Sequence, residues 1–269
     1  MPRWRSAYMS SKKIWAVVNV VGLAATIVVS YGSSVGWFNG ETMATMSARY
    51  PTLITPAPYA FGIWGLIYLS LTGFVVYGVR LSFRDPASDD PVLRVGGWFL
   101  ATCMANCGWV LSWFYGYPAL SVVLMLLLLF SLFRIVVLTD MELTDPPLTV
   151  IAFVWWPFCY YTGWIMVALL ANLAAFFVKL GKPFFVSNET GWVVAMLIVA
   201  SLAYLLLTWK RNMRECALVG VWAFVAIAVK DWHVAPMVAK VALALAWILF
   251  VSSAYHGWRN RALGPFRKR

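Results

Sequence analysis

Long, nearly uncharged stretches recur along the whole chain and constrain its fold more than any other feature. Each stretch is close to the roughly 20 residues that a helix needs to cross about 30 Å of hydrocarbon. Only 12% of the 269 residues are charged, whereas soluble domains average about 25%. The sequence therefore predicts an all-α integral membrane protein with about eight transmembrane helices, at residues 14–36, 57–79, 95–115, 118–138, 148–178, 191–209, 215–230 and 234–256.

The formal net charge of +11 is explained by membrane topology. Basic chains can bind the phosphates of nucleic acids, but here the positive charges alternate between loops. With a cytoplasmic N-terminus, 16 of the 21 Lys and Arg residues fall in cytoplasmic segments, all except Arg49, Lys179, Lys182, Lys230 and Lys240. This asymmetry follows the positive-inside rule. It predicts both termini in the cytoplasm and leaves no need for a nucleic-acid partner. We expect the lipid bilayer as a partner and a bacterial inner membrane as the location.

Ionisable residues at membrane depth, which ion-driven transporters usually need, are scarce. All ten acidic residues lie in loops or at the ends of spans. Lys240 lies about two turns inside the last span, where its side chain either snorkels to the outer surface or serves a functional site. His233 and His256 flank opposite ends of that span, too far apart to bind one metal or haem together. We therefore expect no catalytic or metal-binding constellation, and enzyme activity stays undecided.

Aromatic residues are the remaining distinctive group, with 16 Trp, 12 Tyr and 17 Phe. Some belong to the interfacial belt at the ends of spans, but several Trp residues fall inside spans. Rings at that depth either line a pocket for a flat apolar ligand or fill space between helices. Asn106 and Asn172 also lie inside spans, where a buried Asn needs a partner on another helix, in water or in a ligand. From the sequence, the rings could line a pocket or fill space, and the Asn residues could bind another helix, water or a ligand.

Three segments, in the correct order, resemble motifs of the TspO/translocator-protein family, also called tryptophan-rich sensory proteins. Residues 55–68, TPAPYAFGIWGLIY, are similar to a proline-rich aromatic segment followed by Trp-x-x-x-Tyr. Residues 105–116, ANCGWVLSWFYG, are similar to an Asn-x-x-Trp helix. Residues 161–172, YTGWIMVALLAN, are similar to Tyr-x-x-Trp followed, after seven residues, by Asn. The resemblance covers about residues 14–178, and Tyr160 stands where the family has Pro.

The resemblance implies a five-helix bundle whose first loop, here residues 37–58, closes a pocket. It implies a hydrophobic planar ligand, either a tetrapyrrole (porphyrin) or a sterol- or carotenoid-like isoprenoid, and a sensory, transport or regulatory role. Because the chain continues beyond five helices, we expect a TspO-like unit at residues 1–185 and a three-helix extension with a basic tail at 186–269. The predicted ligand-binding residues are Trp37, Tyr59, Phe61, Trp64, Tyr68, Asn106, Trp109, Trp113, Tyr161, Trp164 and Asn172.

A second interpretation places the chain in another class, as a structural or accessory subunit of a larger membrane complex that could contain pigments. Its support is the extension, where small residues recur, as in ALVGVWAFVAIA and APMVAKVALALA. Small residues let helices approach closely in lipid. They would serve docking onto another protein, formation of a homodimer or, equally well, docking onto the chain's own five-helix unit.

Overall fold

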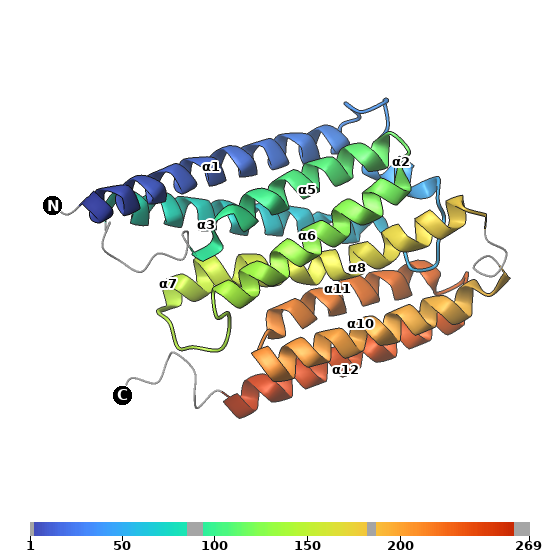
Figure 1. The fold of residues 1–269 in the computed structure, drawn as a ribbon. Helices are drawn as coiled ribbons and strands as arrows, with labels where there is room; N and C mark the ends of the chain where they lie inside the picture. Colours follow the sequence, from blue (N-terminus) through green and yellow to red (C-terminus); the bar gives the residue numbers. More distant parts are fainter. Residues whose placement is uncertain (1–2, 85–93, 182–186, 261–269) are drawn as a thin grey trace.

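The apolar stretches form long helices that lie side by side (Figure 1). The structure, a computed structural model, describes residues 3–84, 94–181 and 187–260, and within these ranges it contains helices and loops but no strand. The elements are α1 (Arg3–Ser34), α2 (Met43–Ala48), η1 (Pro58–Gly62), α3 (Ile63–Arg84), α5 (Gly97–Phe114), α6 (Pro118–Leu138), α7 (Leu148–Val150), η2 (Ile151–Trp155), α8 (Trp156–Lys179), α10 (Glu189–Arg211), α11 (Arg214–Asp231) and α12 (Pro236–Asn260).

Every predicted span corresponds to a long helix, and the differences lie at the helix ends. α1 begins at Arg3, well before its apolar part, because Arg, Lys, Ala and Met favour helix about as strongly as apolar residues do. α3 begins at Ile63 rather than at residue 57, because Pro58 starts a tighter 3-10 turn that leads into the α-helix. Pro157 has no N–H to donate to the preceding turn, and the widened π-turn η2 lies directly before it.

Among the described residues, six helical segments are long and apolar enough to cross a membrane: α1, η1 with α3, α6, α7 to α8, α10 and α12. The two other long helices, α5 and α11, have 18 residues each and pack against these segments. Charged residues mark both ends of α11, which starts with Arg214 and finishes with Asp231. The prediction of an all-α integral membrane protein is confirmed.

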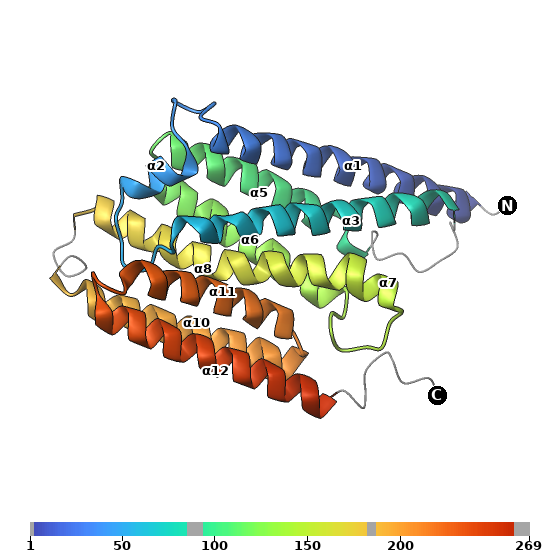
Figure 2. The same cartoon turned by 180° about the vertical axis from the view of Figure 1, so that it is seen from behind.

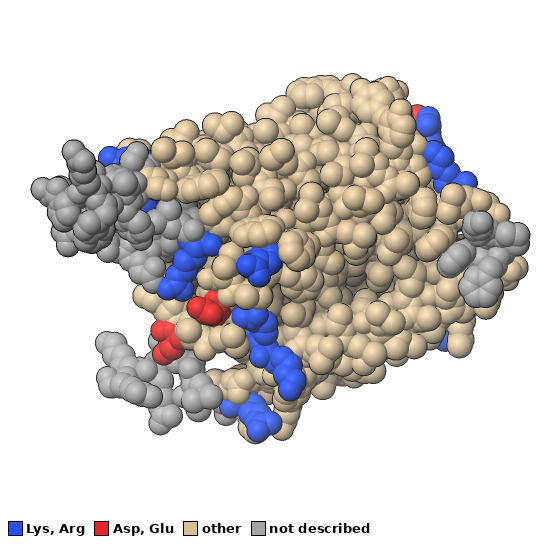
Figure 3. All heavy atoms as spheres, in the orientation of Figure 1, with Lys and Arg blue, Asp and Glu red and all other residues tan. Residues whose placement is uncertain are grey.

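Charged side chains lie toward the ends of the bundle. On the face drawn in Figure 3, Lys, Arg, Asp and Glu gather at the two ends, and uncharged residues cover the middle. Exposed Leu69, Val123 and Leu202 belong to helix faces that a soluble protein would bury. The start of α1 and the end of α12 lie at the same end of the bundle (Figure 1). That arrangement fits the prediction of both termini on one side, while the side itself stays a prediction.

Helix α8 is the centre of the molecule. In residues 148–179, 61% of the most apolar segment is buried, against 28% for the corresponding segment of α1. α8 contacts α3 and α6 as well as α11. The approach of α11 depends on Gly163, because a Cβ atom there would lie 2.7 Å from the carbonyl oxygen of Cys216. Because Gly163 has no side chain, α11 of the extension can pack closely against α8 of the five-helix unit.

The extension forms a second layer beside α8 (Figure 2). Tyr204 of α10 lies against Gly220 of α11, and its hydroxyl donates a hydrogen bond of 2.6 Å to the carbonyl of Gly163. Small residues of the extension therefore serve contacts within this chain. The predicted boundary between residues 185 and 186 lies outside the described residues, and the division into two units stays a prediction.

Candidate functional site

The loop between α1 and α3 is folded around its own polar side chains. The hydroxyl of Thr42 accepts a hydrogen bond from the backbone N–H of Thr45, and the hydroxyl of Thr45 accepts one from the N–H of Thr42, so that α2 begins with a capping box. Glu41 accepts a hydrogen bond of 2.5 Å from the Thr45 hydroxyl and forms an ion pair with Arg49 at the far end of α2. We refer to residues 37–58 as the lid.

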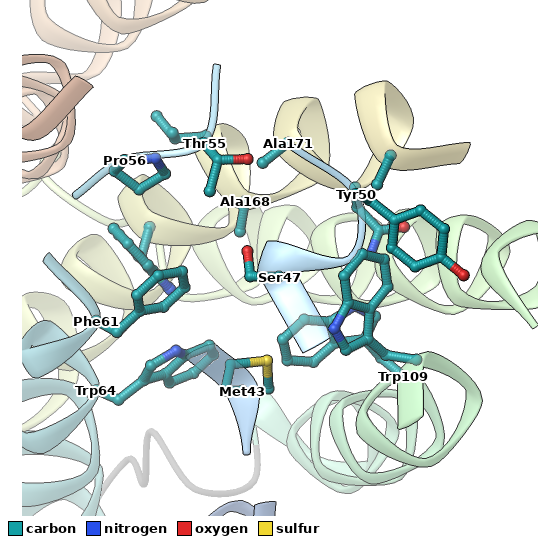
Figure 4. A pocket seen from close by; sticks show the side chains of 15 residues that line it. Met43, Ser47, Tyr50, Thr55, Pro56, Phe61, Trp64, Trp109, Ala168 and Ala171 are labelled. Carbon is teal, nitrogen blue, oxygen red and sulfur yellow. The ribbon is translucent and has the colours of Figure 1, made fainter. Parts of the chain in front are cut away.

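The lid covers a cavity with mainly aromatic walls, the aromatic cavity. Figure 4 shows Phe61 and Trp64 on one side, Tyr50 and Trp109 across from them, and Met43 between. The free volume of about 50 Å³ is far below the roughly 300–1,000 Å³ of most ligand sites, so the lid is closed. The lining residues are Met43, Ser47, Tyr50, Thr55, Pro56, Phe61, Trp64, Trp109, Trp113, Trp164, Val167, Ala168, Ala171, Asn172 and Ala175.

Trp64 is the hub of the aromatic cluster. Its ring stacks on Tyr68 and on Trp109, with centroid distances of 5.3 and 6.2 Å. Tyr161 and Trp164 meet the same ring edge-on, at 5.9 and 6.3 Å. Offset-stacked and edge-on contacts are the favourable geometries for aromatic pairs. Three helices, α3, α5 and α8, thus fix one flat indole surface at the cavity wall.

Three indole N–H groups in this wall are buried and have no hydrogen-bond partner among the described residues. They belong to Trp109, Trp113 and Trp164, whose side chains are 2–7% exposed. A buried donor without a partner loses its hydration and costs on the order of 1–3 kcal/mol. Three such donors around one cavity are unusual, because buried polar groups are nearly always paired. Three residues of the cavity wall thus contribute buried donors without a partner among the described residues.

Two larger spaces adjoin the aromatic cavity. A side chamber of about 350 Å³ lies between α1, α3 and α5 and shares Met43, Phe61, Trp64 and Trp109 with it. There the hydroxyls of Ser30 and Tyr68 are hydrogen-bonded at 2.5 Å. A lid chamber of about 550 Å³ lies between the lid and the extension, and its lining residues are Ser47, Ala48, Pro51, Thr52, Leu53, Thr55, Pro56, Pro58, Phe61, Glu189, Lys230, Asp231 and Val234.

Most predicted site residues line these spaces. Phe61, Trp64, Trp109, Trp113, Trp164 and Asn172 line the aromatic cavity, and Tyr68 lines the side chamber. Four predicted residues do not line them. Asn106 and Tyr161 are buried beside the cavity wall. Trp37 is 61% exposed and packs edge-on against Tyr31, and Tyr59 is 47% exposed and packs against Trp222 of the extension. The role of each as a ligand contact stays a prediction.

The two predicted Asn residues join helices. Asn106 donates from Nδ2 to the Tyr161 hydroxyl at 2.8 Å, behind the aromatic cavity and away from its lining. Asn172 donates from Nδ2 to the Ser121 hydroxyl oxygen at 2.8 Å. Both amides therefore have a partner on another helix, which was one of the open alternatives. Asn106 Oδ1 is buried without a partner among the described residues.

Several lining residues were not predicted one by one. The lid supplies Met43, Ser47, Tyr50 and Pro56, although the sequence resemblance indicated only the loop as a whole. Ala168, Ala171 and Ala175 of α8 also line the cavity. Their spacing of three and four residues places them on one helix face, and this pattern could have been recognised in the sequence.

A polar cluster at the opposite end of the bundle contains groups that could ligate an ion. Potential ligand atoms of Glu142, Cys159 and Glu215 lie within 4.8 Å of one another. Asn212 donates a hydrogen bond of 3.0 Å to Glu142. Burial, followed by the neighbouring Glu215, raises the pKa of Glu142 to about 8, while Arg214 acts in the opposite direction. The charges and the donor already present explain this cluster as a contact between a loop and the extension.

These features define a class of protein: a helical membrane bundle with a closed, lid-covered aromatic cavity. The family model described as TSPO-like protein matches residues 16–255, and the chain belongs to this family. The match continues through the extension, beyond residues 14–178, on which the sequence resemblance rests. Neither the curated proteins nor the solved structures gave a match to the chain.

Proposed function

We propose that the protein binds a hydrophobic planar molecule with hydrogen-bond acceptors in the aromatic cavity and acts through it in sensing, transport or regulation. Family membership supports a membrane ligand-binding or sensory protein in general. The three unpartnered indole N–H groups of Trp109, Trp113 and Trp164 carry the finer proposal. A tetrapyrrole is the first candidate because its flat ring suits Trp64 and its carboxylates accept hydrogen bonds. A sterol- or carotenoid-like isoprenoid is the second.

The closed cavity requires movement before such a ligand can bind. A space of about 50 Å³ does not admit a tetrapyrrole, whereas the adjoining side chamber offers about 350 Å³. Met43 of the lid lines both spaces. A shift of the lid helix α2 that withdraws Met43 would join them into one site of ordinary ligand size.

The test is a titration of the purified protein with a porphyrin, followed by the absorbance of the porphyrin and by Trp fluorescence. Trp109→Phe keeps a ring and removes the N–H, so its affinity should fall roughly two- to tenfold. The double variant Trp64→Ala, Trp109→Ala removes the stacking surface and should lose binding by tenfold or more. Trp247→Phe, on the exposed face of α12, is the control and should bind like wild type.

Undiminished binding by the double variant would place the ligand outside the aromatic cavity. Equal affinities of Trp109→Phe and wild type would show that the indole N–H groups are not used. A sterol titrated in parallel separates the two ligand classes, because a sterol offers a single hydroxyl to the three donors.

A further inference from the structure

The extension contacts the lid through the lid backbone. The carboxylate of Glu189, at the start of α10, accepts a hydrogen bond of 2.7 Å from the N–H of Leu53. The ammonium group of Lys230, near the end of α11, donates to the carbonyls of Thr52 and Thr55, both at 2.6 Å. Charge-assisted hydrogen bonds of this kind are about twice as strong as neutral ones. Two helices of the extension therefore hold the same four-residue segment of the lid.

Two neutral contacts continue this row toward α3. The N–H of Ala57 donates to the carbonyl of Ala226 at 3.1 Å, and the indole N–H of Trp222 donates to the carbonyl of Ala60 at 3.1 Å. Pro56 and Pro58 follow this segment and have no N–H of their own. Inside the segment, the N–H of Thr55 donates to the carbonyl of Thr52 at 3.3 Å, and α11 supplies further partners from Thr52 to Ala60.

The position of Lys230 is fixed by charge as well. Its ammonium nitrogen lies 3.6 Å from Oδ1 of Asp231, whose side chain is 1% exposed. Neither carboxylate oxygen of Asp231 has a hydrogen-bond partner among the described residues. A buried carboxylate is strongly unfavourable without a compensating charge, so Asp231 keeps Lys230 at this end of α11 and against the lid.

The held segment is also a wall between two spaces. Thr55 and Pro56 line both the lid chamber and the aromatic cavity, together with Ser47 and Phe61. Glu189 and Lys230 line the lid chamber but not the aromatic cavity. Movement of the segment away from the extension would therefore join the lid chamber of about 550 Å³ to the aromatic cavity.

We infer that the three-helix extension is a latch on the lid, in which Glu189 and Lys230 are positioning residues that control access to the aromatic cavity through the lid chamber. The part that concerns ligand access rests on the proposed function. The part that concerns lid position stands on the contacts alone. The extension thus adds control of the cavity to the five-helix unit.

Hydrogen–deuterium exchange of the full-length protein without ligand tests the latch directly. Lys230→Met removes the ammonium group that donates to Thr52 and Thr55. Glu189→Ala removes the acceptor for the Leu53 N–H and leaves Lys230 and Asp231 in place. In each variant, we expect amides in residues 52–57 to exchange roughly tenfold faster. Lys230→Arg keeps a charged donor and should remain close to wild type. Lys179→Met is the matched control, because Lys179 donates a hydrogen bond of the same length, 2.6 Å, to a backbone carbonyl outside the lid, that of Gly116.

Porphyrin kinetics then test control of access. Association and dissociation should both accelerate severalfold in Lys230→Met and Glu189→Ala, with a smaller change in Kd, because a latch changes the barrier more than the bound state. Unchanged exchange of residues 52–57 in both variants would overturn the latch, whatever the ligand results. Faster exchange with unchanged porphyrin rates would overturn control of access. If wild type binds neither porphyrin nor sterol, the proposed function fails, and the exchange data still decide the latch.

Discussion

Tyr161 shows, at the scale of a residue, that the aromatic cluster depends on a polar contact behind it. Its ring meets Trp64 edge-on, and its hydroxyl accepts the hydrogen bond from Asn106 on α5. Both side chains are almost fully buried, at 2% and 0% exposure. Asn106 therefore orients the Tyr161 ring through its hydroxyl. The motif residues of the sequence include a supporting layer as well as the cavity wall.

We predict that Tyr161→Phe lowers the free energy of unfolding by about 0.5–2 kcal/mol, because Asn106 keeps a buried amide without its partner. Tyr68→Phe removes a hydroxyl bonded to Ser30 next to the side chamber, where water can replace it, and should change stability less. Thermal unfolding in one detergent compares the two variants. An equal loss in both would mean that the burial of Asn106 does not matter.

Glu142 should make stability depend on pH. Burial raises the pKa of Glu142 from 4.5 to about 8 in the folded protein. Between pH 4.5 and 8, the folded state therefore keeps a proton on Glu142 that the unfolded state has lost. Stability contributed by this proton is present at low pH and is lost as pH rises from about 5 to 8, by roughly 1–3 kcal/mol. Unfolding midpoints across this range should fall in wild type and stay flatter in Glu142→Gln. A slope that is the same in both would assign the pH dependence to another group.

At the scale of elements, glycine positions decide how closely the helices approach. Gly163 of α8 meets the backbone of α11, whereas Gly65 of α3 has no atom within 4 Å of the Cβ position. The two glycines look alike in the sequence, since both lie inside apolar spans. Only the first is required by packing.

Gly163→Ala should therefore separate α8 from α11 and destabilise the protein by about 1–3 kcal/mol, because an inserted methyl group in a tight interface forces a backbone shift. Gly65→Ala should be neutral or stabilising by up to about 1 kcal/mol, because Ala favours helix over Gly. Thermal unfolding of both variants checks the difference. A neutral Gly163→Ala would show that the two layers are more loosely joined than the structure indicates.

At the scale of the whole molecule, the extension is an internal partner. α11 supplies hydrogen bonds to the lid and apolar contacts to α8, and α10 and α12 pack around α11. Gly220, one of the small residues that favoured an accessory subunit, is used within the chain, where Tyr204 lies against it. The family match through residue 255 fits this arrangement, in which the extension and the five-helix unit share one hydrophobic core.

The sequence by itself determined the fold class, the position of each long helix and the stretch that forms the lid. Hydropathy suffices for the fold class and the helices, because a helix that crosses lipid must be apolar over a fixed length and must satisfy its own backbone. The lid was indicated by the resemblance to the family. The motif order also indicated most of the cavity wall, since Trp64 and Tyr68, or Trp109 and Trp113, share a helix face by spacing alone.

Only the tertiary structure decided what surrounds these residues. Trp37 begins the lid and Trp64 follows it in the sequence, yet Trp37 is on the surface and Trp64 is the hub of the aromatic cluster. Lys230 and Lys240 both lie near one end of a span, yet only Lys230 binds the lid backbone, and Lys240 is exposed. Such differences depend on contacts between segments up to 178 residues apart. The periodicity of a single helix contains no information about which distant backbone will face it.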